Sequence, residues 1–480
     1  MVFSSFLFLF LFLPGTLAAY YLAPMRFRNA VLLAASLVFY AWGAPRFVLV
    51  LVAGTWIDWT ISKAIHAAPM RSTARRRWLV LSLVLNLGLL AWFKYANFAV
   101  EEFRLIAGML GWGAAPWAAV ALPIGISFFT FHKISYLVDV HEGVSEPAAS
   151  YPLCLLYIVL FPQLIAGPIV RYHDVDRQLV SREHSLSRFV AGLCRFCVGM
   201  AKKVLVANAI AGTADAVFGA PIASVSTGIA WVGVLAYSFQ IYFDFSGYSD
   251  MAIGLGRMFG IEFLENFDRP YRSRDFTEFW QRWHISLSRF MREYLYIPLG
   301  GNRVPTVRLY LNLWIVFLLS GLWHGASWTF IAWGAYQGVF LSLDKLFWHR
   351  IAMRLPRFVT VPLTFLLVTL GWVFFRAETF GKAFALLRRL VLPPGVVPEV
   401  TPMLLARVLD HRGITMMVVA AVVCFLPGLP RPARWIDPAA GARHLAGALV
   451  PITAAGLAML LLCICALANS SFNPFIYFRF

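Results

Sequence analysis

The chain has 480 residues, of which 60% are hydrophobic and only 13% are charged. This composition excludes a soluble globular protein and predicts a membrane protein whose apolar surface faces lipid. Lys and Arg number 41 against 23 Asp and Glu, so the formal net charge is +18. Most of the basic residues border apolar stretches, so we expect them in cytoplasmic loops against anionic lipid headgroups and not on a nucleic-acid-binding face.

The N-terminal part alternates apolar runs with basic loops. We predict membrane spans at residues 1–21, 29–42, 47–65 and 78–98, with Asp58 inside the third. The densest early basic loop follows that third span, from Arg71 to Arg77. The positive-inside rule makes this loop cytoplasmic, which places the N-terminus outside.

The middle of the chain carries less regular apolar segments. Residues 118–138, 189–218 and 229–245 are predicted to cross the membrane. The apolar piece 154–169 contains Pro162, Gly167 and Pro168, and we expect it to be re-entrant or interfacial.

The predicted main cytoplasmic segment, 250–308, is highly charged and has no clean span. Apolar arms follow at 309–319 and 330–341, and further spans at 358–375, 414–425 and 445–467. These runs predict an all-α polytopic membrane protein of about 12 crossings, with a single domain over residues 1–480. The C-terminal tail, 469–480, falls on the extracytoplasmic side of this topology.

One amphipathic helix is predicted within the cytoplasmic segment, over residues 275–294. Asp275 followed by Glu278 forms a capping-box pattern at its start. Aromatic and aliphatic residues recur at three- and four-residue steps, and His284 lies at the margin of that apolar stripe. The pattern fits an interfacial helix with a half-buried histidine, or a helix that holds His284 at the mouth of a cavity.

His324 lies between two apolar arms, where a titratable side chain marks a functional site. Gly321 and Gly325 bracket it and predict a helix break or a close helix approach. A buried histidine without a counter-charge stays neutral, which is the form that a general base requires. The alternative is a histidine hydrogen-bonded inside the bundle. The neighbouring sequence offers no further ligands for a metal site.

Several segments resemble the membrane-bound O-acyltransferase family. They are Leu322-Trp323-His324-Gly325, residues 279–288 (FWQRWHISLS), 122–129 (LPIGISFF), 161–169 (FPQLIAGPI) and 244–250 (DFSGYSD). Within the family, the chain most resembles the bacterial branch that contains the alginate O-acetyltransferase membrane subunit and its peptidoglycan, cellulose and D-alanyl relatives. The resemblance extends over the whole chain.

The resemblance implies a ring of about 11–12 transmembrane helices, with re-entrant or interfacial helices, around a central funnel. His324 matches the family's catalytic histidine at the base of the funnel, and His284 matches the second family position on the cytoplasmic side. An acyl thioester, expected to be acetyl-CoA, enters from the cytoplasm as a substrate, and no cofactor is bound permanently. The residues expected to bind this donor are Arg282, Trp283, Arg289 and Asp244.

The arginines of the cytoplasmic segment could attract a phosphorylated donor. The residues in question are Arg272, Arg274, Arg282, Arg289, Arg292 and Arg303. Ordinary positive-inside charge explains any one of them equally well.

The C-terminal segment 473–480 is aromatic and is similar to the tail motif of a small partner in the D-alanylation pathway. This similarity suggests that Tyr477 relays the acyl group, because a phenol ester is a reactive acyl carrier. The alternative is an aromatic anchor at the membrane interface.

These features together predict a bacterial inner-membrane O-acetyltransferase that acts in the modification of an exported polysaccharide, most simply alginate. Peptidoglycan or cellulose O-acetylation and teichoic-acid D-alanylation are the alternatives within the family. A proton-coupled transporter is the alternative from another class, although the paired broken helices typical of transporters are not evident. The expected partners are membrane lipid and periplasmic acetyltransferase or relay proteins, and no nucleic acid. Both termini are expected in the periplasm.

Overall fold

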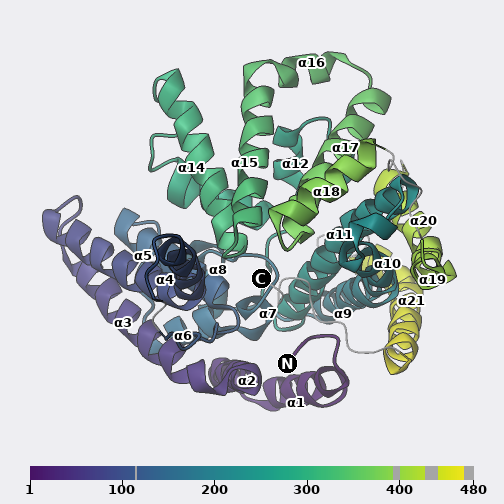
Figure 1. Cartoon of the computed structure of the whole chain (residues 1–480). Helices are drawn as coiled ribbons and strands as arrows, with labels where there is room; N and C mark the ends of the chain where they lie inside the picture. Colours follow the sequence, from purple (N-terminus) through teal and green to yellow (C-terminus); the bar gives the residue numbers. More distant parts are fainter. Residues whose placement is uncertain (114–115, 393–399, 427–441, 470–480) are drawn as a thin grey trace. The chain divides into compact units, whose positions relative to one another are not determined.

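The computed structural model describes residues 1–113, 116–392, 400–426 and 442–469, and these residues form helices and no strands (Figure 1). The prediction of an all-α protein is therefore confirmed. Backbone contacts divide the chain into two units. The first unit comprises Met1–Phe189 with Leu255–Leu264, and the second comprises Val190–Gly254 with Glu265–Phe480. The single domain over residues 1–480 stays a prediction.

The first unit is built from helices near the N-terminus. They are α1 (Leu13–Leu22), α2 (Arg28–Gly43), α3 (Val48–Ala67), α4 (Thr73–Met109), α5 (Ile126–Glu142), α6 (Tyr151–Val159), α7 (Phe161–Leu164) and α8 (Tyr172–Val180). α9 (Leu186–Ala201) begins in the first unit and ends in the second.

The second unit contains the remaining helices and all of the candidate site residues that the structure describes. Its helices are α10 (Asn208–Gly219), α11 (Thr227–Met258), α12 (Phe276–Arg282), α13 (Ile285–Met291), α14 (Thr306–His324), α15 (Trp328–Leu343), α16 (His349–Arg354), α17 (Arg357–Arg376), α18 (Phe380–Val391), α19 (Pro402–Val408), α20 (His411–Phe425) and α21 (Ala442–Ala468). α11 leaves this unit at Gly254.

Among the described residues, 6 helical segments are long and apolar enough to cross a membrane. They are Pro45–Ala67, Thr73–Met109, Thr306–His324, Arg357–Arg376, Pro402–Phe425 and Val450–Ala468. The chain is therefore a multi-pass membrane protein. The other predicted crossings form shorter or interrupted helices, and their passage through the membrane stays a prediction.

Several predicted boundaries differ from those in the structure. The helix predicted over 118–138 begins only at Ile126, after Pro123 and a left-handed Gly125 (φ 76°). The segment predicted over 229–245 is longer, because α11 continues through the first part of the supposed cytoplasmic segment 250–308. The segment 154–169 is interrupted in the structure, since α6 ends before Leu160 and α7 is a single short turn, and its re-entrant or interfacial position stays a prediction.

Buried polar groups of the first unit are paired across its helices. Lys133 Nζ of α5 lies 3.1 Å from Asp58 Oδ2 of α3, and Asn86 Nδ2 of α4 donates to Asp58 Oδ1 at 2.7 Å. This pairing is what a charged side chain inside an apolar bundle requires. It therefore fixes three consecutive long helices to one another.

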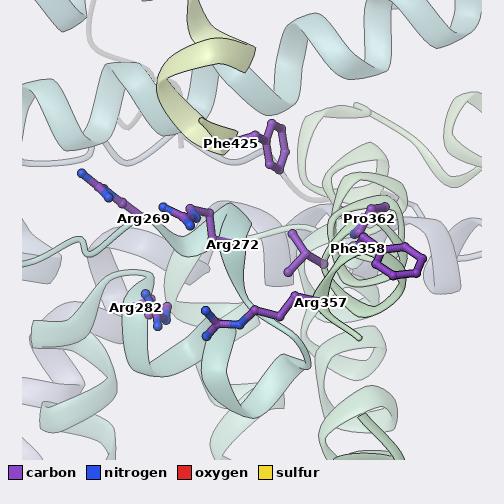
Figure 2. A pocket seen from close by; sticks show the side chains of 8 residues that line it. Arg269, Arg272, Arg282, Arg357, Phe358, Pro362 and Phe425 are labelled. Carbon is purple, nitrogen blue, oxygen red and sulfur yellow. The ribbon is translucent and has the colours of Figure 1, made fainter. Parts of the chain in front are cut away.

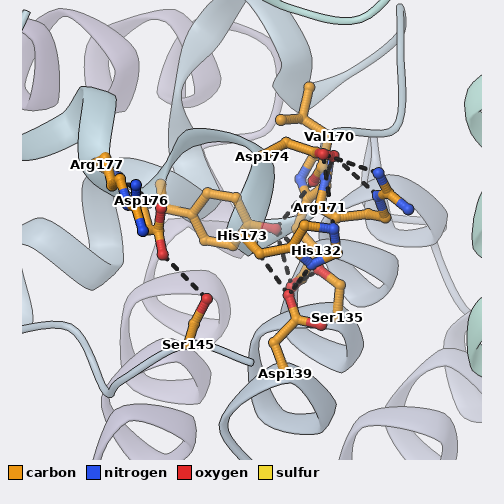
Figure 3. Close-up of polar contacts among 11 residues, drawn as sticks. His132, Ser135, Asp139, Ser145, Val170, Arg171, His173, Asp174, Asp176 and Arg177 are labelled. Carbon is orange, nitrogen blue, oxygen red and sulfur yellow. Dashed lines mark hydrogen bonds and ion pairs between the residues drawn. The ribbon is translucent and has the colours of Figure 1, made fainter. Parts of the chain in front are cut away.

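A second polar network connects α5 to α8 (Figure 3). His173 Nδ1 lies 2.9 Å from Asp139 Oδ2, and the side chain of Arg171 binds Asp174 at 2.8 Å. The hydrogen bond that the His173 ring donates to the Asp139 carboxylate raises the pKa of His173. The network thus anchors α8, which follows α7, to α5.

In the second unit, α14 and α15 pack with their backbones in close contact. A Cβ atom added at Gly321 of α14 would lie 2.4 Å from the carbonyl oxygen of Phe330 in α15, and one at Gly334 of α15 would lie 2.3 Å from that of Phe317. Only glycine allows such an approach. The close approach predicted at Gly321 is therefore confirmed, and it holds His324, the last residue of α14, against α15.

Candidate active site

His284 lies at a break between two short helices, where a single helix over 275–294 was predicted. α12 ends at Arg282, and α13 begins at Ile285. His284 itself has left-handed backbone angles (φ 43°, ψ 54°), which are uncommon for a residue with a Cβ atom. Such a conformation persists only where surrounding contacts enforce it, and it is frequent at functional sites. The prediction of one continuous helix was wrong.

The capping box predicted at the start of α12 is present only in part. Asp275 Oδ1 accepts the backbone N–H of Glu278 at 2.7 Å, but the Glu278 carboxylate accepts from the N–H of Arg274 and not from that of Asp275. Asp344 Oδ2 also accepts the N–H of Thr277 at 2.7 Å. The first turn of the helix that leads to His284 is thus fixed by three carboxylates.

Asn266 orients the His284 ring. Asn266 Oδ1 lies 3.0 Å from His284 Nδ1 and also accepts the backbone N–H and the hydroxyl of Ser286. Its amide nitrogen donates to Ser249 Oγ at 3.0 Å, and the backbone N–H of Ser286, which can only donate, fixes the amide orientation. Because the oxygen faces the ring, His284 Nδ1 carries the proton and Nε2 keeps its lone pair.

His284 Nε2 has no hydrogen-bond partner among the described residues, and the side chain is 0% exposed. Burial lowers the pKa of His284 to about 3, so the ring is neutral at physiological pH. A neutral imidazole with an unpartnered lone pair is equipped to accept a proton or a hydrogen bond from a ligand. The histidine is fully buried, not half-buried at a helix margin.

His324 is enclosed by aromatic rings from α14, α15 and α17. Its ring centroid lies 4.9 Å from that of Trp323, 5.0 Å from Trp333 and 5.1 Å from Phe375. The residue is 4% exposed. These rings exclude bulk water from the imidazole, which strengthens electrostatic interactions there.

Trp323 connects the two histidines. Its ring lies 6.3 Å from that of His284 and 4.9 Å from that of His324. Phe245 of α11 packs perpendicular to the other side of His284 at 4.6 Å. The structure therefore brings the two predicted histidines to one aromatic cluster, although they come from a helix break and a helix C-terminus.

A pocket of about 540 Å³ beside α12 and α17 collects four arginines (Figure 2). They are Arg269, Arg272, Arg282 and Arg357, and the remaining lining is apolar, from Phe358, Val361, Pro362 and Phe425. Burial, followed by repulsion from Arg269, Arg357 and Arg282, lowers the pKa of Arg272 below its ordinary value. Like charges gathered around one space favour a multiply charged anion as ligand.

The pocket arginines differ in how they are compensated. Arg282 Nη2 lies 2.7 Å from Glu278 Oε1. Within the described part of the chain, the guanidinium groups of Arg272 and Arg357 have no ion-pair partner. Two uncompensated charges therefore face the pocket.

The other residues predicted to bind the donor lie apart from this pocket or are already paired. Trp283 is buried and packs against Trp372 at 4.9 Å. Arg289 is exposed on α13 and does not line the pocket. Asp244 Oδ1 forms a buried ion pair with Lys203 Nζ at 2.7 Å. Tyr477 lies outside the described residues.

Several residues of this region could not be predicted from the sequence. Asn266, Arg269 and Arg357 lie outside the motifs that drew attention, and no local pattern distinguishes them. Trp333 and Phe375 belong to apolar helices, where aromatic residues are common. Arg274 was expected to attract the phosphorylated acyl donor, but its guanidinium donates hydrogen bonds to the backbone carbonyls of Ala352 and Leu355.

Among the described residues, no group of three or more His, Cys, Asp or Glu side chains is arranged to hold a metal ion.

A helical membrane protein with two buried histidines in an aromatic cluster and an adjoining cationic pocket has the features expected of a membrane acyltransferase. The family model described as MBOAT, membrane-bound O-acyltransferase family, matches residues 119–379. The chain belongs to this family and is an O-acyltransferase.

Curated relatives cover the whole chain. It is 40% identical to a protein of Pseudomonas aeruginosa named "Probable alginate O-acetylase AlgI" and 41% identical to the protein of that name from Azotobacter vinelandii, in each case over 100% of both chains. It is 38% identical to the peptidoglycan O-acetyltransferase of Helicobacter pylori, over 82% of this chain and 81% of that one.

Proposed function

We propose that this O-acyltransferase takes acetyl groups from acetyl-CoA on the cytoplasmic side of the bacterial inner membrane and passes them towards an exported polysaccharide, foremost alginate. The observation that carries the proposal is the position of the four-arginine pocket within the same helices as the histidine cluster. α12 supplies Arg282 and is followed at once by His284, and α17 begins with the pocket residue Arg357 and reaches Phe375 beside His324.

The pocket supports a donor that carries phosphate groups. Arginine binds phosphate through two parallel N–H donors, and uncompensated guanidinium groups make this binding favourable. The rise from Arg357 to Phe375 along α17 is roughly 27 Å at 1.5 Å per residue. A donor whose phosphates lie near Arg357 therefore needs a long arm to reach His324, and the pantetheine arm of CoA is such an arm.

In the proposed mechanism, His324 is the general base. It removes the proton from the acceptor hydroxyl as that oxygen attacks the thioester carbonyl, and it returns the proton to the departing thiolate. His284 is positioned by Asn266 with its Nε2 lone pair free, so it accepts a hydrogen bond from the incoming group and orients it. The surrounding rings exclude water, which would hydrolyse the thioester.

The relatives support the choice of acceptor. Two that cover the whole chain are named as alginate O-acetylases, and a more distant one as a peptidoglycan O-acetyltransferase. Alginate is therefore the acceptor we propose, with peptidoglycan or cellulose acetylation and teichoic-acid D-alanylation as alternatives. Periplasmic acetyltransferase or relay proteins complete the transfer, and Tyr477 is proposed to carry the acyl group to them from a periplasmic C-terminus.

Sealed membrane vesicles of both orientations test the proposal. Acetyl-CoA labelled in the acetyl group does not cross the membrane, so we expect label on polymer or protein only when the cytoplasmic face is accessible, and none with His324→Ala. Label arising only from the periplasmic face would contradict the sidedness. A proton-coupled transporter, the remaining alternative, would leave acetyl-CoA intact in both orientations.

A further inference from the structure

Two buried hydrogen-bond donors beside the histidine cluster have no acceptor. Trp333 Nε1 and Gln337 Nε2 have no hydrogen-bond partner within the described parts of the chain. Trp333 is 1% exposed, and Gln337 is 0% exposed. A buried donor without an acceptor is destabilising, so native proteins seldom retain one without a functional reason.

The orientation of the Gln337 amide is fixed by its neighbour. Trp280 Nε1 can only donate, and it lies 3.2 Å from Gln337 Oε1. The oxygen must therefore face Trp280, and the NH₂ group faces the other way. That group lies towards α17, 3.3 Å from where a Cβ atom of Gly371 would be. The unpartnered donor is thus an NH₂ group and not a misassigned oxygen.

Both donors lie on the face of α15 that packs against the site. Trp333 and Gln337 are four residues apart on this helix, so their side chains are neighbours. The Trp333 ring is perpendicular to that of His324 at 5.0 Å and lies 5.9 Å from that of Trp280. The same face therefore carries His324's aromatic neighbour and, one turn further, the second donor.

Two other indole N–H groups in the described part of the chain have acceptors. Trp59 Nε1 donates to the carbonyl of Ala148 at 2.9 Å, and Trp231 Nε1 donates to that of Leu390 at 3.1 Å. Trp333 Nε1 has no acceptor among the described residues, so its N–H can donate to an acceptor that arrives with a ligand.

We propose that Trp333 Nε1–H and Gln337 Nε2–H donate hydrogen bonds to the carbonyl oxygen of the bound thioester and stabilise the oxyanion that forms on it. The proposal deepens the proposed function and rests on it. When the acceptor hydroxyl oxygen bonds to the carbonyl carbon, the hydroxyl proton passes to His324 and the π electrons move to the carbonyl oxygen. That oxyanion is held by the two donors until the C=O bond re-forms and the C–S bond breaks. The thiolate then takes the proton from His324, which leaves an ester and a free thiol.

Donors placed where negative charge develops stabilise the transition state more than the ground state. Removing one such donor from an enzyme lowers kcat by about 10²- to 10³-fold, with little change in substrate binding. A Trp333 that served only in packing would instead affect folding, and any change in activity would follow the amount of folded protein.

The test uses membrane vesicles of the full chain and measures thiol release from acetyl-CoA. Trp333 is replaced by its benzothiophene analogue, which keeps the ring shape but has sulfur in place of N–H, and also by Phe. Gln337→Glu keeps an acceptor for Trp280 but presents oxygen where the NH₂ was. We expect kcat to fall about 10²-fold with KM for acetyl-CoA nearly unchanged for each. Trp231→Phe, which removes an N–H that donates to a carbonyl, is the control and keeps wild-type kcat.

A spectroscopic measurement on the non-reacting His324→Ala protein completes the test. Acetyl-CoA with an isotope-labelled carbonyl is bound, and its C=O stretching frequency is recorded. We expect the frequency to lie below that in water and to rise when the Trp333 analogue or Gln337→Glu is added. Unchanged kcat and an unchanged frequency would overturn the role of these donors. Undiminished transfer by His324→Ala itself would instead contradict the proposed function, so the two failures are distinguishable.

Discussion

Two clusters of buried polar groups, one in each unit, differ in how they are partnered. In the first unit, the Asp58 carboxylate binds both Lys133 and Asn86. In the second unit, His284 Nε2 and the donors of Trp333 and Gln337 lack partners among the described residues. An unpartnered buried polar group costs about 1–3 kcal/mol, whereas a paired one can hold helices together. The difference indicates that Asp58, Lys133 and Asn86 serve stability, whereas the unpartnered groups of the histidine cluster are kept for a ligand.

The largest expected effect comes from breaking the pair in the first unit. Lys133→Met leaves the Asp58 carboxylate buried without its cation, so we expect a loss of about 3–5 kcal/mol in the free energy of unfolding. The measurement is thermal or denaturant unfolding in detergent. Adding Asp58→Asn removes the buried charge and should restore most of the stability, and kcat per folded molecule should remain at the wild-type level. A large loss of kcat with normal stability would contradict the purely structural role of the Asp58–Lys133 pair.

In the histidine cluster, removing an orienting group should act on rate and not on folding alone. Asn266→Ala removes the acceptor that fixes the orientation and the tautomer of the His284 ring. We therefore expect kcat to fall about 10- to 100-fold, the usual effect of removing a group that orients a functional histidine. Asn312→Ala is the matched control, because Asn312 is also buried in the second unit and donates to the carbonyl of Leu299. Equal loss of kcat in both variants would mean that Asn266 is only structural.

The arginine pocket should affect donor binding. Arg272→Gln and Arg357→Gln each remove an uncompensated charge, and we expect about a 10-fold increase in KM for acetyl-CoA, the size of one charge-assisted contact, with kcat nearly constant. The increase should shrink at high salt. Arg388→Gln, an exposed position on α18, is the control. If Arg289→Gln raises KM as strongly as Arg272→Gln, the donor lies along α13 and not in the pocket.

The last expected effect is a pH dependence of stability. The folded-state pKa of His284, about 3, is below the ordinary value of 6.5. The unfolded state therefore binds more protons between these values, and the stability that His284 contributes is complete above about pH 6.5. It is lost as pH falls, by up to about 1.4 kcal/mol per pH unit. Unfolding midpoints between pH 7 and pH 5 should fall less steeply in His284→Gln than in wild type, and parallel slopes would contradict the buried neutral histidine.

Part of this architecture could be predicted from the sequence because local patterns determine it. Apolar runs gave the helical membrane class, and Gly321 beside His324 indicated the close approach of α14 and α15. The break at His284 could not be predicted, since its left-handed backbone is held by Asn266 from a separate segment. The ion pair of Asp244 with Lys203 likewise depends on tertiary packing.

The arginine pocket, too, could be predicted only in part from the sequence. Arg272 and Arg282 lie in the charged segment that the sequence singled out, but Arg357 comes from the start of an apolar helix. By their charge alone, Arg289 and Arg274 were candidates for donor binding as good as Arg272 and Arg282. Only the packing of α12 against its neighbours separates arginines that face a common space from those that are exposed or bound to backbone carbonyls.

Removing His324 tests whether the buried histidine cluster performs acyl transfer. Labelled acetyl transfer from acetyl-CoA is followed in membranes that contain the wild-type protein or His324→Ala, with equal amounts of folded protein verified. We predict loss of label from acetyl-CoA and gain on protein or polymer in the wild type only. Equal labelling by both proteins would show that His324 is a packed histidine, and the site would have to be sought elsewhere.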